Sequence, residues 1–299
     1  MESYKALVRH ILSSGVKKKN RTGVDTIPVS GYMFEHNMKD GFPLLTTKKM
    51  AYKSIFTELE FFIKGFHDKQ WLKDHKNHIW DEWCSPVFHK YSTDPEEQEK
   101  MKECDELGPI YGVQWRNFNG QHEFDTNLNK MDAEPDTLVK GVDQLKYIVN
   151  EIKNNPDSRR LICSAWNPNQ MDTMALPPCH VLWQVLINTE TETMDLIWYQ
   201  RSVDTMLGLP FNIASYAMLL ELLCRESGKY RPGKLIGMLG DVHIYTNHIK
   251  GAMEQLERPT HRLPLIYIKD FDSIFNFDAS NVEIIGYESE DKINFDIAV

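Results

Sequence analysis

Two apolar stretches decide the fold: HVLWQVLIN at residues 180–188 and TMDLIWYQRS at residues 193–202. Both are rich in Val, Ile, Leu and aromatic side chains, a composition typical of β-strands. Only a short polar turn, Thr189 to Thr191, joins them. Because so short a connection brings two strands together in antiparallel fashion, we predict a β-hairpin.

Strand-like and helix-like segments surround this hairpin. Further strands are predicted at LICSAW (161–166), KLIGML (234–239) and near 263–268 and 282–287. Helices are predicted over 3–13, 51–64 and 142–153, from Asn212 to Gly228, and after Tyr245. Since the two kinds of element do not alternate as regular βαβ units, the sequence predicts an α+β fold.

Length and composition indicate one globular domain over residues 1–299. Hydrophobic residues make up 41% and charged residues 26% of the 299 residues, enough for a large core. The net charge of -9 argues against a general nucleic-acid binder, which needs a broad basic surface. Two polar stretches, 85–105 and 118–137, are expected at the surface, and the sequence leaves the order of the first open.

The cysteines and the absence of apolar runs indicate the compartment. No stretch resembles a secretory signal or approaches the ~18 apolar residues of a membrane helix. The five cysteines are scattered without a CxxC pair, so a zinc site is poorly supported and no metal is expected. Reduced thiols are typical of a cytoplasmic protein.

Cys179 is the candidate nucleophile, in the segment MALPPCH at 174–180. Two prolines fix the backbone before it, although a rigid loop is an equally good interpretation of this segment alone. Neighbouring residues of an extended chain face opposite sides, so we expect His180 to point away from Cys179.

Polar residues follow in QRSVD at 200–204 and LGLPFN at 207–212. Arg201 and Ser202 can donate hydrogen bonds to a phosphate or a thiolate. Asp204 ends an otherwise apolar strand. Asn212 opens an apolar helix, where the usual role of asparagine is that of an N-cap.

Several other polar residues carry a weaker signal. Arg159 and Arg160 at a helix-to-strand junction, and Arg21 beside a glycine, can hold a phosphate or simply face solvent. His243 and Tyr245 share one face of a strand. Further candidates are Glu58, as a proton carrier with a raised pKa, and Trp80, Trp83 and Tyr111, as flat surfaces for a ring.

The order of these motifs resembles the folate-dependent thymidylate synthase family. The resemblance rests on SRRLICSAWNP, MALPPCH, YQRSVDTMLGLPFNIASYA and GDVHIYTNHI, with FPLLTTKKM, HIWDEW, LGPIYGVQWR and the final IAV. It spans the chain from Arg21 to Val299. It implies a mainly antiparallel sheet layered against helices, with the sheet forming a homodimer interface.

The resemblance also implies a reaction, in which dUMP and 5,10-methylenetetrahydrofolate give dTMP and dihydrofolate. The implied catalytic residues are Cys179, Glu58, Arg201, Asn212, Asp204 and Tyr111. The implied dUMP-binding residues are Arg21, Arg159, Arg160, Gln200, Arg201, Ser202, Asp204, Asn212, His243 and Tyr245, with Arg159 and Arg160 acting across the dimer. The implied folate-binding residues are Lys48, Trp80, Trp83, Leu176, Asp204, Gly208 and Val299.

Asn212 has a chemical argument of its own. An amide donates one hydrogen bond and accepts another, which matches O4 and N3–H of uracil. Cytosine presents the reverse pattern, and mispairing buried polar groups costs ~1–3 kcal/mol each. Asparagine at this position therefore favours uracil.

Two departures from the family pattern leave alternatives open. Val24 and Asp25 stand where Thr-Gly is frequent, which brings a carboxylate near the expected phosphate loop. Glu60 stands where an apolar residue is common, and a second glutamate there resembles a hydroxymethylase branch. Because Glu58 and Glu60 cannot share a helical face, we expect Glu60 to lie outside the pocket. The rival functions are a dUMP hydroxymethylase, in which water replaces hydride, and a non-catalytic RNA-binding homologue.

Overall fold

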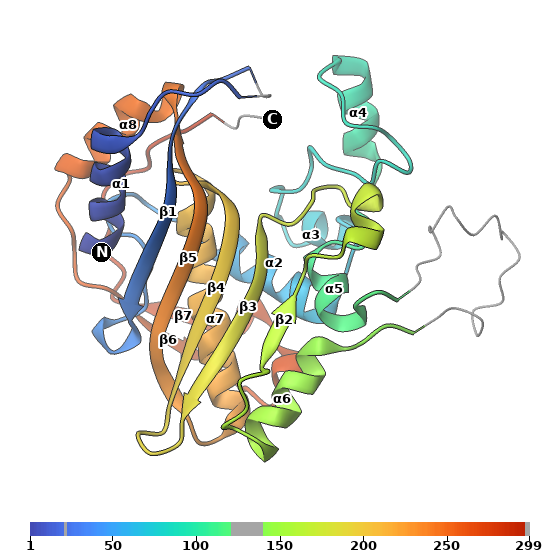
Figure 1. The fold of residues 1–299 in the computed structure, drawn as a ribbon, viewed down its shortest axis with the longest axis vertical. Coiled ribbons are helices and arrows are strands. Elements are labelled where there is room, and N and C mark those ends of the chain that lie inside the picture. The colour runs from blue at the N-terminus through green and yellow to red at the C-terminus, as the bar shows by residue number, and fades with distance from the viewer. Residues whose placement is uncertain (21–22, 121–139, 297–299) are drawn as a thin grey trace, which may run out of the picture.

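The computed structural model is described here for residues 1–20, 23–120 and 140–296, so Arg21 and Val299 lie outside the described residues. Its centre is a five-stranded sheet with the order β1-β5-β4-β3-β2 (Figure 1). The strands are β1 (Thr26–Asn37), β2 (Ile162–Ser164), β3 (His180–Asn188), β4 (Thr193–Asp204) and β5 (Arg231–Tyr245). Strands β6 (Leu265–Ile268) and β7 (Val282–Ile285) form a separate antiparallel pair.

The predicted hairpin is present and forms one half of the sheet. Strands β3 and β4 pair antiparallel, with Trp183 opposite Trp198. Strand β4 pairs parallel with β5, and the other neighbours in the sheet pair antiparallel. The mainly antiparallel α+β fold is therefore confirmed.

Helices cover one face of the sheet. Helices α2 and α7 lie behind the strands in Figure 1, and α1 lies against β1. Helix α7 is buried along most of its length because its side chains are apolar nearly all round. The helix bounds are α1 Glu2–Ser14, α2 Tyr52–Lys64, α3 Gln70–Asp74, α4 Pro95–Glu103, α5 Tyr111–Asn117, α6 Gln144–Asn154, α7 Gly208–Ser227 and α8 Ile249–Glu257. No described helix is long and apolar enough to cross a membrane.

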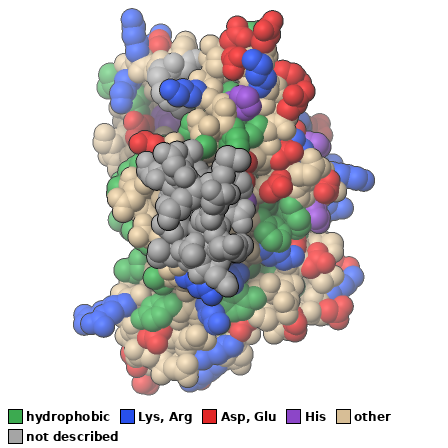
Figure 2. All heavy atoms as spheres, turned by 90° about the vertical axis from the view of Figure 1, so that its right-hand side faces the viewer, with side chains coloured by type: hydrophobic (Ala, Val, Ile, Leu, Met, Phe, Trp, Pro, Cys, Tyr) green, Lys and Arg blue, Asp and Glu red, His purple; other side chains and the backbone are tan. Residues whose placement is uncertain are grey.

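The polar stretch 85–105 contains helix α4, which was not predicted from its sequence. Asp94 caps α4 by accepting from the backbone N–H groups of Glu96 and Glu97, and Pro95 occupies the first turn. Acidic side chains gather at the top of the face shown in Figure 2, where α4 lies. The predicted polar stretch 118–137 falls mostly outside the described residues.

One strand was not predicted, and the bounds of two other elements differ from the predictions. Strand β1 was not predicted, because Pro28 and Gly31 interrupt its pattern. Strand β5 extends well beyond the predicted 234–239 on both sides. Helix α7 begins at Gly208, so Asn212 lies inside it and the predicted N-cap role is wrong. Pro210 is tolerated because it lies in the first turn, where an N–H needs no helical partner.

The viewer-facing side of the sheet in Figure 1 carries no helix of the described residues. Large apolar side chains lie exposed on neighbouring strands there: Met33 on β1, Met238 on β5 and Tyr199 on β4 are 60%, 44% and 41% exposed. Met238 is the register partner of both Met33 and Tyr199. The open side of the sheet is therefore a continuous apolar surface.

Candidate active site

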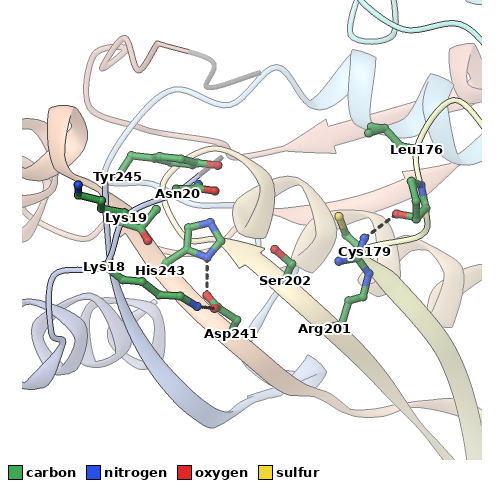
Figure 3. A pocket seen from close by; sticks show the side chains of 12 residues that line it. Lys18, Lys19, Asn20, Leu176, Cys179, Arg201, Ser202, Asp241, His243 and Tyr245 are labelled. Atoms are coloured by element: carbon green, nitrogen blue, oxygen red, sulfur yellow. Dashed lines mark hydrogen bonds and ion pairs between the residues drawn. The ribbon is translucent and has the colours of Figure 1, made fainter. Parts of the chain in front are cut away.

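A pocket of about 530 Å³ opens at one end of the sheet (Figure 3). Six of the predicted site residues line it: Leu176, Cys179, Arg201, Ser202, His243 and Tyr245. The other residues that line it were not predicted as site residues: Lys18, Lys19, Asn20, Thr26, Pro177 and Asp241. The pocket thus combines a thiol, several cations and hydrogen-bonding groups.

Cys179 is held at the pocket wall by backbone and side-chain hydrogen bonds. Its backbone N–H donates to the Tyr111 hydroxyl at 2.8 Å, and its carbonyl accepts from the Arg201 N–H at 2.8 Å. The Arg201 guanidinium donates to the carbonyls of Pro178 and Pro177, each at 2.8 Å. Arg201 therefore fixes the segment that presents the thiol and places a cation in the same pocket.

His180 points away from this wall, as predicted. Its Nδ1 lies 2.7 Å from the Tyr216 hydroxyl, and its ring stacks on Tyr111 at 3.9 Å. Burial lowers the pKa of His180 to about 3, so the ring is neutral at physiological pH. It supports the aromatic packing behind Cys179.

Asp241 organises the opposite wall. Its Oδ1 lies 2.8 Å from Nδ1 of His243, and its Oδ2 lies 3.6 Å from Nζ of Lys18 (Figure 3). Residues 241, 243 and 245 alternate along β5 and all line the pocket. The period-two pattern that singled out His243 and Tyr245 extends to Asp241, and this signal could have found it.

Asn212 belongs to a chain of side-chain hydrogen bonds. Gln200 Nε2 donates to Asn212 Oδ1 at 3.0 Å and to the Ser202 carbonyl at 3.2 Å. Gln200 Oε1 accepts from the indole N–H of Trp198 at 3.2 Å. Two predicted dUMP-binding residues are thus joined directly.

Glu58 lies on α2 near Tyr111. Its Oε1 accepts from the Trp80 indole N–H at 2.8 Å. The side chain keeps a partly accessible surface, but protein surrounds the carboxyl group, and this burial raises the pKa of Glu58 to about 7. A carboxyl group with such a pKa can take up and release protons at neutral pH.

The residues predicted for folate lie around the start of α7. Asp204 Oδ1 accepts from the backbone N–H groups of Met206 and Leu207 at 3.0 and 3.1 Å. The ammonium group of buried Lys48 donates to the Met206 carbonyl. Burial lowers the pKa of Lys48 to about 8, against the opposing effect of Asp204.

Of the other folate candidates, Gly208 adjoins Asp204, whereas Trp83 packs elsewhere. Gly208 begins α7, and an added Cβ there would meet only Asn212 and Asp204 at an ordinary 3.8 Å. The Trp83 ring stacks on Tyr91 at 5.6 Å. The structure therefore brings Lys48, Asp204 and Gly208 together, whereas Trp83 packs against a residue of the 85–105 stretch.

Comparison with known proteins accounts for this arrangement. A family profile described as Thymidylate synthase matches residues 2–299. The chain is 43% identical to thymidylate synthase of Mycoplasma genitalium, over 96% of each chain. It is 41% identical to thymidylate synthase of Mesoplasma florum, over 100% of each chain.

The chain belongs to the thymidylate synthase family. Membership implies an enzyme of the methyltransferase type that uses dUMP and a folate co-substrate. The two departures from the thymidylate synthase pattern can now be located in the fold.

Both departures lie outside the pocket wall. The Asp25 carboxylate pairs with Lys17 Nζ at 2.9 Å and does not line the pocket. Glu60 is buried, pairs with Lys64 and accepts from the Ala279 N–H at 2.8 Å. The expectation that Glu60 lies outside the pocket is therefore correct.

Arg159 and Arg160 do not line the pocket of their own chain. Both are exposed and directly precede Leu161 and strand β2, at the edge of the sheet. The pocket is lined by other segments. The structure therefore does not bring these two arginines to the pocket of the same chain.

Proposed function

We propose that this chain catalyses the reductive methylation of dUMP to dTMP, with 5,10-methylenetetrahydrofolate as co-substrate and dihydrofolate as second product. The observation that carries the proposal is Cys179 at the wall of a cation-lined pocket, with Arg201 holding its backbone. The family assignment supports the same reaction.

The nucleophile has a defined task. C5 of uracil is not nucleophilic enough to attack a folate carbon. When the Cys179 thiolate adds to C6, the base becomes an enolate whose C5 is nucleophilic. A guanidinium such as Arg201 in the same pocket stabilises the thiolate form.

The pocket lining and the family pattern together support an assignment for the rest of the nucleotide. Arg201, Ser202 and Arg21 bind the phosphate, with Arg159 and Arg160 from a second copy. His243 and Tyr245 bind the 3′-hydroxyl of deoxyribose, and the Asp241 carboxylate fixes the His243 ring. Asn212, held by Gln200, recognises the base.

We assign proton transfer and folate binding to the remaining predicted site residues. The 5,10-methylenetetrahydrofolate co-substrate supplies the carbon and the hydride. Glu58, with a pKa of about 7, exchanges protons with the base, assisted by Tyr111 and Asn212. Asp204 binds the pterin. Lys48, Trp80, Trp83, Leu176, Gly208 and Val299 line the folate site and exclude water.

A product assay tests the reaction. Incubation with dUMP and the folate should raise the dihydrofolate absorbance and yield dTMP. Hydroxymethyl-dUMP without dihydrofolate would identify the hydroxymethylase instead. A complete lack of turnover would favour a non-catalytic, RNA-binding homologue.

Covalent trapping tests the nucleophile separately. 5-Fluoro-dUMP with the folate should form a stable adduct with the wild-type chain, detected by intact mass. Cys179→Ser should form none, whereas Cys104→Ser, a change at a half-buried cysteine outside the pocket lining, should trap normally. An adduct with Cys179→Ser would show that another group attacks.

The homodimer is part of the same proposal. The apolar side of the sheet, with Met33, Tyr199 and Met238 exposed, fits the same surface of a second copy. Tyr199→Glu should give a monomer in sedimentation velocity and lose activity, because Arg159 and Arg160 then reach no partner. Tyr267→Glu, an equally exposed site on β6, is the control. A fully active monomer would refute the shared site.

A further inference from the structure

A buried tryptophan, Trp198, begins the hydrogen-bond chain that ends at Asn212. Its side chain is 0% exposed, and its Nε1 lies 3.2 Å from Gln200 Oε1. Gln200 is also buried, and its Nε2 lies 3.0 Å from Asn212 Oδ1. This series of hydrogen bonds runs from the inner face of β4 to α7.

The chemistry of the groups fixes the direction of every bond in this chain. An indole N–H can only donate, so the oxygen of Gln200 must face Trp198. The Ser202 carbonyl can only accept, and it lies 3.2 Å from the Gln200 nitrogen. Both neighbours therefore demand the same orientation of the Gln200 amide. That orientation makes Gln200 a donor toward Asn212.

Side-chain packing fixes the position of the Trp198 indole, the first group in this series of hydrogen bonds. Gly237 on β5 is its register partner, and a Cβ at that glycine would come within 2.6 Å of the indole ring. On α7, Tyr216 stacks on the indole at 5.3 Å with an interplanar angle of 14°. The indole fills the space above the glycine, so its N–H has a fixed direction.

We propose that Trp198 is a positioning residue for base selection: through Gln200 it holds the Asn212 amide with Oδ1 toward Gln200. This inference rests on the proposed function, in which Asn212 contacts the pyrimidine. The Asn212 NH2 group is then the amide end left for position 4 of the base. It donates to the O4 of uracil and opposes the amino group of cytosine.

Without the indole N–H, Gln200 Oε1 loses the donor that holds the Gln200 amide in this orientation. Only the hydrogen bond to the Ser202 carbonyl then opposes rotation of the Gln200 amide. A rotated Gln200 presents oxygen to Asn212, and Asn212 can rotate in turn. A rotated Asn212 presents oxygen to position 4, which suits cytosine. Discrimination between dUMP and dCMP therefore depends on a group that contacts neither nucleotide.

The experiment measures the dissociation constants of dUMP and dCMP by calorimetry for the wild type and Trp198→Phe. The expected result is a fall in the dUMP preference of about tenfold or more, as for one mismatched buried hydrogen bond. The matched control is Trp183→Phe. Trp183 is equally buried and is the register partner of Trp198, but its Nε1 has no hydrogen-bond partner among the described residues. Its loss should leave the preference unchanged.

A second substitution separates the hydrogen bond from the packing. Benzothienylalanine at position 198 replaces the indole N–H by sulfur and keeps the ring shape. This variant can therefore be measured instead if Trp198→Phe does not fold. It should lower the preference as Trp198→Phe does. In a Gln200→Leu background, either change at Trp198 should have no further effect on the preference.

Two outcomes would overturn the inference. One is an unchanged preference in a folded variant that lacks the N–H. The other is an equal loss of affinity for both nucleotides, which a purely structural role predicts. If the wild type itself binds dUMP no better than dCMP, the proposed function fails first, and the inference fails with it.

Discussion

The indole N–H of Trp80 donates to Oε1 of Glu58 across 2.8 Å, from the turn after α3 to helix α2. Burial disfavours the charged carboxylate and raises the pKa of Glu58 to about 7, while the Trp80 hydrogen bond opposes this rise. The active-site region therefore contains a carboxyl group, close to Tyr111, whose pKa is near neutral pH.

Glu58→Gln should change how stability depends on pH. A raised pKa in the folded state means that the stability contributed by Glu58 is complete below its unfolded pKa of ~4.3 and is lost as pH rises through about 7. The Tm of Glu58→Gln minus that of the wild type should rise between pH 5 and 7 and then level off. Glu97→Gln, on helix α4 and paired with Lys100, is the control for removing a carboxylate away from the pocket. A flat difference for Glu58→Gln would contradict the assigned pKa.

Trp80→Phe should move the Glu58 titration to higher pH. The substitution removes a hydrogen bond that favours the charged carboxylate and leaves an aromatic ring in place. The 13C resonance of the Glu58 carboxyl group, followed against pH, measures the change. Trp83→Phe is the control, since the Trp83 ring stacks on Tyr91. A titration at the wild-type pH, or below it, would show that the hydrogen bond has no such role.

Gly237→Ala should destabilise the fold by about 1–3 kcal/mol, the usual cost of overpacking a core. The new methyl group would lie 2.6 Å from ring atoms of Trp198. Urea unfolding measures this loss in the wild type and in a Trp198→Leu background. The smaller leucine leaves room, so the cost of Gly237→Ala should be smaller there. Equal costs in both backgrounds would mean that the indole does not occupy the space above Gly237.

Glu60→Ala should lower the free energy of unfolding by about 2 kcal/mol and leave the KM for dUMP unchanged. The substitution removes a buried carboxylate that binds Lys64 and the Ala279 N–H. Glu60→Gln should cost less, because its oxygen can still accept from Ala279. A variant that formed hydroxymethyl-dUMP would instead assign Glu60 a role in the reaction.

Sequence periodicity was sufficient for the elements whose pattern is clear. The helices over 51–64 and 142–153 and the hairpin of β3 and β4 lie where they were predicted. Strand β1 was missed because Pro28 and Gly31 weaken its local preference, which pairing with β5 overrides. The helix start at Gly208 was missed because Asn212 has the composition of a cap but not the position of one.

Some residues of the candidate site were also predicted from the sequence, and others were found only in the structure. Cys179, Arg201 and His243 stand in local motifs, and the order of these motifs along the chain, rather than any single motif, predicts their chemistry. Lys18 and Asp241 line the same pocket although more than two hundred residues separate them in the sequence. Their proximity depends on the register of β1 with β5, in which Thr26 lies opposite Tyr245.

The sequence by itself predicted the segment of the candidate nucleophile, the hairpin that follows it and the amide that we propose selects the base. These features depend on residues close together in the chain, where backbone geometry and side-chain chemistry act locally. The tertiary structure alone decided which groups meet: Trp198 with Gln200 and Asn212, and Glu58 with Trp80. Such contacts depend on strand register and helix packing, and no local pattern of residues encodes these.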